Sequence, residues 1–516
     1  DYAGNNWTRN QTPTVTYDTS EPTAGIQVPT HGGFYSALAT ISGTSVDNVG
    51  VSTVALSIQD ISAAAPNCYA YTSNAFNAAC PNFFPAQGVV GAWTFTGITW
   101  TGNHQYIVTS RATDQATNEQ STFNPSTSSN TFTYATGTEA PVVAITNPTA
   151  DRHKDLLSGG LSTIAGTAAI NAPNVISRVL VRIRESEGLF YYWNPGSLTF
   201  DGVASAEVAW TTATYTSNWT SWTLSSGVPY VDGSKYDIEA RARDMAGNFS
   251  VTFTTVVVYD ATAPETAVGF PANNSFINAL SMTTGTLVDK TGSGANLGKV
   301  PDVQVQFKRL SGAGSCWTGV AWAGCPQTLI PPNLIKVWQT SWTINTGNLP
   351  TPMTSGTSYY ITSSGTDNAA PTGNVEGFGS VRGSTFIYNA DPPVSSIAAP
   401  LSGAYYRVLA AVNGGAAAAF SNVTLSTVAI SLQNDTLAGP NNCYVPNGGF
   451  TAACPPSAAG WFKPAGSNNP WNFAFNNAAL FAHASHYVLL SSATDMAGNV
   501  QVALSSAGFT FDTLLP

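Results

Sequence analysis

Apolar and polar residues alternate over short stretches of this chain, and one such stretch occurs four times. Its copies begin at Tyr106, Tyr236, Tyr359 and Tyr487, and in each copy an aspartate follows eight residues after the tyrosine. The tyrosine, an aliphatic residue, two small residues and the aspartate fall on one face, as expected for a half-buried β-strand. Two copies continue with Ala-Gly-Asn, which favours a tight hairpin because glycine and asparagine tolerate positive φ. A pattern that returns about every 125 residues predicts tandem domains.

Two further strand patterns occur at matching places in every copy. One is an alternating aliphatic strand, such as Val54-x-Leu56-x-Ile58 or Val179-x-Val181-x-Ile183. The other begins at a tryptophan, and its copies start at Trp93, Trp222, Trp342 and Trp471. We expect each indole to fill the core of its own domain, since large aromatic side chains dominate burial. About seven short strands per copy without an amphipathic helix predict an all-β fold of antiparallel two-sheet sandwiches, in which the recurring tyrosine is typical of a tyrosine corner.

A proline-containing phrase marks the boundaries, as in Tyr259-Asp-Ala-Thr-Ala-Pro264. It predicts four domains, named here repeats one to four, at residues 18–136, 137–260, 261–389 and 390–516, the last ending with the start of a further joint. Residues 1–17 are interpreted as the last strand of a preceding or neighbouring domain. The chain is therefore expected to be part of a longer protein or a subunit completed by strand exchange. Short joints with proline restrict the chain, which favours a semi-rigid rod.

The Asp-x-Ala-Gly-Asn phrase after the tyrosine strand, together with the proline phrase at the joints, resembles the tandem Ig-like repeats of very large bacterial surface proteins. The resemblance covers essentially the whole chain, and it implies Ig-like or fibronectin-III-like sandwiches exported to the cell surface as stalks, adhesins or fibres. Repeat three departs from the pattern, because Asp367 and Asn374 enclose a longer turn. Repeat four has a glycine- and alanine-rich stretch at Asn413–Phe420, so its first sheet is expected to be irregular.

Composition narrows the possible functions. Charged residues make up 9% of the chain, the net charge is −10, and no cluster of Lys and Arg is visible along the sequence, which argues against nucleic acid as a partner. The sequence contains no run of about 20 apolar residues, which is the length that a membrane-spanning helix needs. Motifs such as G-x-S-x-G and H-E-x-x-H are absent from the sequence, so no enzymatic activity is expected.

The cysteines form three local pairs within repeats one, three and four. The pairs are Cys68 with Cys80, Cys316 with Cys325, and Cys443 with Cys454. An even number in each repeat favours intradomain disulfides and an oxidising, extracellular location. A zinc site is the alternative, but each repeat offers at most two cysteines and no histidine lies near them.

Calcium is the one cofactor that the sequence suggests. One aspartate recurs at the same hairpin of every repeat, as Asp114, Asp244, Asp367 and Asp495. Further aspartates lie at or near the joints, and clustered carboxylates between domains can bind Ca²⁺ and stiffen a rod. The alternative is that each aspartate makes an Asx turn with its own backbone.

Three functions are compatible with these features. The first is a structural segment of an extracellular filament or cell-surface stalk, with neighbouring repeats or subunits of the same protein as partners. The second is an adhesin that binds surface glycans or a partner cell through the variable insertions. The aromatic residues that would contact such a ligand are Tyr191, Tyr192, Trp193, Trp317 and Trp322. The third is a set of accessory modules of a secreted hydrolase.

Overall fold

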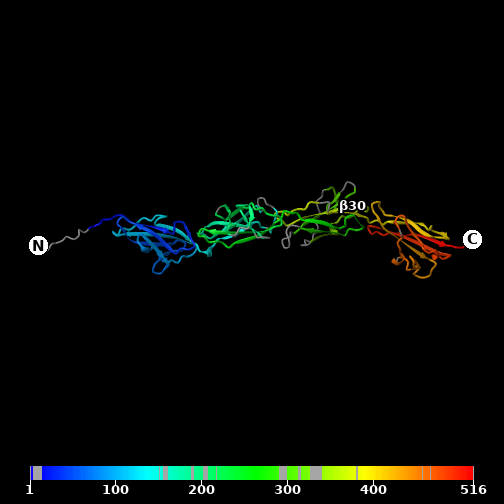
Figure 1. The fold of residues 1–516 in the computed structure, drawn as a ribbon, viewed down its shortest axis with the longest axis horizontal. Helices are drawn as coiled ribbons and strands as arrows, with labels where there is room; N and C mark the ends of the chain where they lie inside the picture. The colour runs from blue at the N-terminus through cyan, green and yellow to red at the C-terminus, as the bar shows by residue number, and fades with distance from the viewer. Residues whose placement is uncertain are drawn as a thin grey trace. The chain divides into compact units, whose positions relative to one another are not determined.

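The computed structural model describes residues 2–3, 14–149, 151–154, 161–186, 191–201, 207–216, 218–289, 299–300, 302–311, 315–325, 340–378, 382–455, 457–464 and 466–514. Over these residues the strands form eight sheets in four pairs, which confirms an all-β fold of four tandem sandwiches (Figure 1). The chain divides into two compact units, Asp1–Asp260 and Ala261–Pro516. Most of the predicted N-terminal strand, at residues 1 and 4–13, lies outside the described residues. The predicted domain boundaries stay predictions.

Repeat one pairs a sheet of order β1-β3-β9-β8 with a larger sheet of order β2-β11-β10-β4-β5-β6, in which β7 also pairs with β4. Its strands are β1 (Thr23–Val28), β2 (Gly33–Tyr35), β3 (Thr40–Val46), β4 (Val51–Asp60), β5 (Cys68–Ala70), β6 (Ala75–Ala78), β7 (Phe84–Pro85), β8 (Gln87–Val89), β9 (Ala92–Thr96), β10 (His104–Asp114) and β11 (Ser129–Tyr134).

Repeat two has the same arrangement, with sheets of order β12-β14-β20-β19 and β13-β22-β21-β15-β16-β17, and with β18 beside β15. Its elements are the 3-10 turn η1 (Gly137–Glu139) and the strands β12 (Val142–Asn147), β13 (Arg152–His153), β14 (Thr163–Ala169), β15 (Ile176–Glu185), β16 (Tyr192–Asn194), β17 (Thr199–Asp201), β18 (Thr211–Thr212), β19 (Thr214–Thr216), β20 (Ser221–Ser225), β21 (Lys235–Asp244) and β22 (Phe253–Tyr259).

Repeats three and four keep this topology in sheets β23-β25-β29 with β24-β31-β30-β26-β27-β28, and β32-β34-β38 with β33-β40-β39-β35-β36-β37. The elements of repeat three are β23 (Glu265–Phe270), β24 (Ser275–Ile277), β25 (Met282–Val288), β26 (Asp302–Arg309), β27 (Ser315–Trp317), β28 (Trp322–Ala323), β29 (Ser341–Asn345), η3 (Thr346–Asn348), β30 (Thr357–Thr366) and β31 (Ser384–Tyr388). Those of repeat four are β32 (Val394–Ala399), β33 (Ala404–Tyr406), β34 (Ala411–Ala417), β35 (Leu425–Asn434), β36 (Cys443–Val445), β37 (Gly449–Ala452), η4 (Ala458–Gly460), β38 (Trp471–Ala474), η5 (Ala478–Leu480), β39 (Ser485–Asp495) and β40 (Ser505–Phe511).

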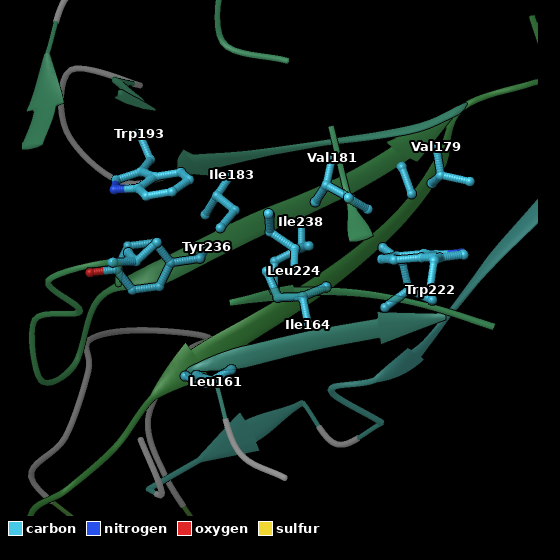
Figure 2. Packing of buried hydrophobic residues seen from close by; sticks show 14 of the residues in the cluster. Leu161, Ile164, Val179, Val181, Ile183, Trp193, Trp222, Leu224, Tyr236 and Ile238 are labelled. Carbon is cyan, nitrogen blue, oxygen red and sulfur yellow. The ribbon is translucent and has the colours of Figure 1, made fainter. Parts of the chain in front are cut away.

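Each repeat has its own hydrophobic core between its two sheets. In repeat two the aliphatic residues of β15 meet the tyrosine strand, with Trp222 beside Val179 at one end and Tyr236 near Ile183 at the other (Figure 2). The four recurring tryptophans are almost completely buried, at 1%, 1%, 2% and 0% exposed for Trp93, Trp222, Trp342 and Trp471. The expectation that each of them fills the core of its own repeat is confirmed.

The glycine-rich stretch of repeat four forms a regular strand, which corrects the expectation of an irregular first sheet. β34 pairs with both β32 and β38. A Cβ on Gly414 would overlap the ring of Trp471 and the carbonyl oxygen of Ser396. Glycine is required here because the indole of the neighbouring strand lies directly across the backbone, and Gly43, Gly166 and Gly285 occupy the same place in the other repeats.

Candidate functional site at the joints between repeats

The tyrosine of each recurring phrase forms the predicted tyrosine corner. Its hydroxyl accepts a hydrogen bond from the backbone N–H five residues earlier. The four N–H···O distances are 2.9 Å from Thr101 to Tyr106, 2.8 Å from Val231 to Tyr236, 2.8 Å from Thr354 to Tyr359 and 2.8 Å from Ala482 to Tyr487. Burial is the main cause that raises the pKa of Tyr106 to about 12. The corner therefore anchors the loop that precedes each tyrosine strand.

The aspartate and the asparagine of each phrase close the hairpin that follows. In repeat one the backbone N–H and the side-chain amide of Asn118 donate to the two carboxylate oxygens of Asp114, both at 2.8 Å. The same two bonds connect Asn248 to Asp244, Asn374 to Asp367 and Asn499 to Asp495. Each aspartate therefore bonds to the backbone of its own hairpin, through the N–H four residues on in repeats one, two and four. An Asx turn, in which the carboxylate accepts from the N–H two residues on, is present at Asp367, where Ala369 is the donor at 2.9 Å.

The asparagine also reaches the joint that leads into its repeat. The side-chain amide of Asn248 donates to the carbonyl oxygen of Ala135, at 3.1 Å. Equivalent bonds run from Asn118 to the Asp18 carbonyl at 3.1 Å and from Asn499 to the Asn389 carbonyl at 2.7 Å. One side chain therefore fastens both the hairpin and the incoming chain, and we call this arrangement the joint clamp. The sequence marked these asparagines only as turn residues.

Two more contacts join neighbouring repeats inside the compact units. In the first unit, the side-chain amide of Asn103 in repeat one donates to the Ala172 carbonyl of repeat two, at 3.1 Å. In the second unit, the amide of Asn422 in repeat four donates to the Gly356 carbonyl of repeat three, at 2.9 Å. These joints are held by direct hydrogen bonds between side chains and backbone, with few residues between the repeats.

Repeat one has an acidic cluster at its joint. Asp18, Asp47 and Asp114 each place one carboxylate oxygen so that the three atoms lie within 4.8 Å of one another. Asp18 Oδ2 and Asp47 Oδ1 are buried and have no hydrogen-bond partner among the described residues. Carboxylate oxygens are the ligands that Ca²⁺ prefers, and a cation would relieve the repulsion between like charges at this distance. These residues could hold calcium, and Asp47 is a ligand candidate that the sequence did not indicate.

In repeats two and four the aspartate equivalent to Asp114 accepts a hydrogen bond from an asparagine side chain instead of lying beside other carboxylates. The side-chain amide of Asn174 donates to Asp244 Oδ2 at 2.8 Å, and that of Asn389 donates to Asp495 Oδ2 at 2.7 Å. A neutral donor thus occupies the place that a cation would take. The geometry gives no support to calcium at Asp244 or Asp495, while calcium at Asp367 stays a prediction.

The candidate aromatic ligand contacts divide into buried and half-buried residues. Trp193 is only 3% exposed and lies in the core of repeat two (Figure 2). Trp317 is only 4% exposed and lies in the core of repeat three, so the expectation that these two residues contact a ligand is wrong. Trp322 is half-buried and packs against the ring of Tyr359, at 5.6 Å between ring centroids. Tyr191 and Tyr192 are half-buried. The insertions therefore extend the core rather than display these indoles.

The three predicted disulfides are confirmed. Cys68–Cys80, Cys316–Cys325 and Cys443–Cys454 each close a short loop, with Cα–Cα distances of 5.3, 5.3 and 5.1 Å. In repeats one and four the bridge links the two ends of a small hairpin, β5–β6 or β36–β37, which lies at the edge of the larger sheet. Because cross-links of this kind persist in oxidising compartments, they support an extracellular location.

Comparisons with known proteins give no sequence family and only distant structural similarities. No protein-family model matches the chain, and no curated protein matches it. Among solved structures it is similar to the FN1–FN3 domains of chicken CNTN1, with 12% identity over 72% of this chain and 98% of that chain and a TM-score of 0.25. It is also similar to immunoglobulin domains 1–5 of Sidekick-1, with 9% identity over 95% and 80% of the two chains and a TM-score of 0.26.

A third similar structure is that of the fibronectin(III)-like modules of CbhA from Clostridium thermocellum. It has 12% identity over 46% of this chain and 94% of that chain, with a TM-score of 0.22. The chain consists of tandem Ig-like or fibronectin-III-like β-sandwiches. This description rests on the paired sheets of the described residues and not on these distant similarities, and it carries no function, because such sandwiches serve many unrelated functions. Among the described residues no helix is long and apolar enough to cross a membrane.

Proposed function

We propose that this chain is a structural segment of an extracellular filament or cell-surface stalk, in which tandem Ig-like repeats set length and stiffness. The observation that carries the proposal is the joint clamp. The same phrase that closes the last hairpin of a repeat also binds the chain that enters it, as Asn248 does at Ala135. A joint fastened by side chains restricts hinge motion, which is what a load-bearing array needs.

The chemistry of the exterior supports the same role. The three disulfides suit an oxidising, extracellular compartment, and the low charge content of 9% leaves a surface rich in Ser, Thr and Asn. The partners in this proposal are neighbouring repeats or subunits of the same protein. No catalytic role is part of the proposal.

Electron microscopy of the native material tests this function. We expect long fibres or stalks with a periodicity set by single sandwich domains. Antibodies against repeat two, bound to the native material, would mark the same structures at regular intervals. Isolated stalks that end in distinct heads would instead favour the adhesin alternative. Particles dominated by a compact globular body would favour accessory modules of a hydrolase.

A further inference from the structure

Arginine is concentrated on the outer face of the larger sheet of repeat two. β15 presents arginines at alternate positions, and so does the adjacent end of β21. We name the five residues the arginine face: Arg178, Arg182, Arg184, Arg241 and Arg243. The whole chain contains only 18 Lys and Arg, so more than a quarter of its cationic side chains lie on this one face. This grouping of arginines is not evident in the sequence because β15 and β21 are far apart along the chain.

Aromatic rings lie between the guanidinium groups. The guanidinium carbons of Arg182 and Arg241 are 4.5 and 4.2 Å from the centroid of the Trp210 ring. Those of Arg241 and Arg243 are 4.5 and 5.4 Å from the Phe249 ring. Because two guanidinium groups use each ring, little aromatic surface is left for a sugar to stack on. Arginine together with Trp, Tyr and Phe is instead the composition that is enriched at protein–protein interfaces.

Carboxylates neutralise only part of the arginine face. Three ion pairs occur there: Arg182–Glu239, Arg184–Asp237 and Arg241–Glu207. Arg178 and Arg243 lie directly opposite each other on β15 and β21, and neither has an ion pair among the described residues. The Nε of Arg178 is buried without a hydrogen-bond partner. Like charges in directly opposite positions destabilise a sheet, so an anionic group from outside would stabilise this end of the face.

The other repeats show that the fold does not require these arginines. The positions that match Arg178 and Arg243 are Thr53 and Thr113 in repeat one, Asp302 and Thr366 in repeat three, and Thr427 and Thr494 in repeat four. An apolar residue also lies at the edge of the face, since Val256 stands opposite Asp237 and is 41% exposed. At these positions the other repeats carry threonine or aspartate, whereas the face of repeat two is basic, aromatic and partly apolar.

A second copy of this chain offers the complementary charge. The chain carries −10 overall, and repeat one contains a single cationic residue, Arg111. Its acidic residues are Asp18, Glu21, Asp47, Asp60, Asp114 and Glu119, of which Asp60 and Asp114 are buried and the other four reach the surface. We propose that the arginine face of repeat two docks on the acidic surface of repeat one in a second copy. Such a contact joins two different surfaces, so it can propagate from copy to copy. It goes beyond the proposed function, because lateral association would serve a stalk and an adhesin equally.

Sedimentation velocity of the whole chain over a range of concentrations tests this inference. We expect reversible self-association at low salt that weakens as salt screens the charges. The double variant R178Q/R243T should weaken it at least about tenfold, because it removes the two unpaired guanidinium groups while leaving the three ion pairs. The matched control K308Q/K463Q removes the same charge from repeats three and four and should leave association unchanged. R178K/R243K, which keeps the charge, should retain the salt dependence.

A variant on the partner surface identifies the occupant. E119Q removes an exposed carboxylate of repeat one that pairs with Arg111, which makes this surface less acidic and should weaken association, whereas D512N, which removes the exposed partner of His483 in repeat four, should not. Unchanged thermal melting shows that each variant is folded. The inference is wrong if the wild-type chain stays monomeric at low salt, or if R178Q/R243T and its control behave alike. It is equally wrong if the face binds polygalacturonate while the chain remains monomeric, since the occupant would then be an acidic polysaccharide.

Discussion

Single polar side chains in the recurring phrase each satisfy several backbone groups. The hydroxyl of Tyr106 both accepts from the N–H of Thr101, at 2.9 Å, and donates to its carbonyl, at 3.2 Å. Asn118 serves the hairpin and the joint with one amide. Since a buried backbone group without a partner is costly, these few side chains determine the geometry of the loops that strand pairing leaves open.

Replacing Tyr106 with Phe should destabilise repeat one by about 1–3 kcal/mol, because the N–H of Thr101 loses its acceptor while the ring stays in the core. Hydrogen exchange measured by mass spectrometry resolves the repeats, and faster exchange should be confined to repeat one. Tyr71→Phe is the matched control, because that side chain is 50% exposed. Equal effects of the two substitutions would contradict a role for the corner bond.

Alkaline pH should reduce the contribution of the corner. Burial raises the pKa of Tyr106 to about 12, whereas the pKa of tyrosine in an unfolded chain is about 10. The neutral hydroxyl therefore stabilises the fold fully below pH of about 10, and this contribution is lost as the pH rises through about 12. We expect the difference in melting temperature between the wild type and Tyr106→Phe to narrow over that range. A difference that stays constant would rule out this assignment.

Calcium should bind at Asp18, Asp47 and Asp114 in repeat one. Added Ca²⁺ is expected to slow hydrogen exchange in repeat one and excess chelator to reverse the effect, since ligand binding to the folded state stabilises it. Asp47→Asn should abolish the response without breaking the bonds between Asp114 and Asn118. Asp201→Asn, in repeat two, is the control. No response of the wild type to Ca²⁺ or to chelator would show that the cluster is only a set of hairpin and joint carboxylates.

At the level of strands, the sequence predicted those parts whose pattern is local. The tyrosine, tryptophan and aliphatic strands repeat with clear periodicity. The tyrosine and aliphatic strands lie side by side in the middle of each larger sheet, and the tryptophan strand pairs with the glycine-containing strand of each smaller sheet. The sequence failed where burial depends on contacts between distant segments. Trp193 was expected on a surface but lies in the core, because β16 folds back beside β15 and turns the indole inward. The pairing of Arg178 with Arg243 has the same origin, since strand register is a tertiary property.

In the smaller sheet of each repeat, a tryptophan ring lies directly against a glycine of the neighbouring strand, and this contact gives a further prediction. Gly166→Ala should destabilise repeat two by about 1–3 kcal/mol, because the new methyl group would overlap both the Trp222 ring and the Ala144 carbonyl oxygen. Gly227→Ala is unsuitable as a control because its φ is positive, whereas Gly324→Ala has open space around the new methyl group. Local exchange rates again separate the repeats. If Gly166→Ala leaves the free energy of unfolding unchanged, strands β12, β14 and β20 can move apart to admit the methyl group without loss of stability.

At the scale of the whole chain, hydrogen bonds at the joints connect sandwiches that would otherwise be independent of one another. The clamp recurs at the joints that lead into repeats one, two and four, and it uses residues of the same phrase that closes each hairpin. Fold and joint geometry are therefore encoded together. In repeat three the asparagine closes a longer turn, between Asp367 and Asn374, through the same two bonds to the aspartate.

Loss of one clamp should loosen one joint and leave both sandwiches folded. Asn248→Ala removes the bond to the Ala135 carbonyl, but it also removes the side-chain bond to Asp244. Asn248→Asp removes both side-chain bonds and adds repulsion with Asp244, so it is the stronger perturbation of the clamp, while the backbone N–H of residue 248 can still donate to Asp244. Spin labels placed in repeats one and two should then give a broader distance distribution. Ser197→Ala, in a surface turn of repeat two, is the control. If the distribution keeps its width in Asn248→Asp, the bond to Ala135 does not restrain the joint, and stiffness must come from elsewhere in the array.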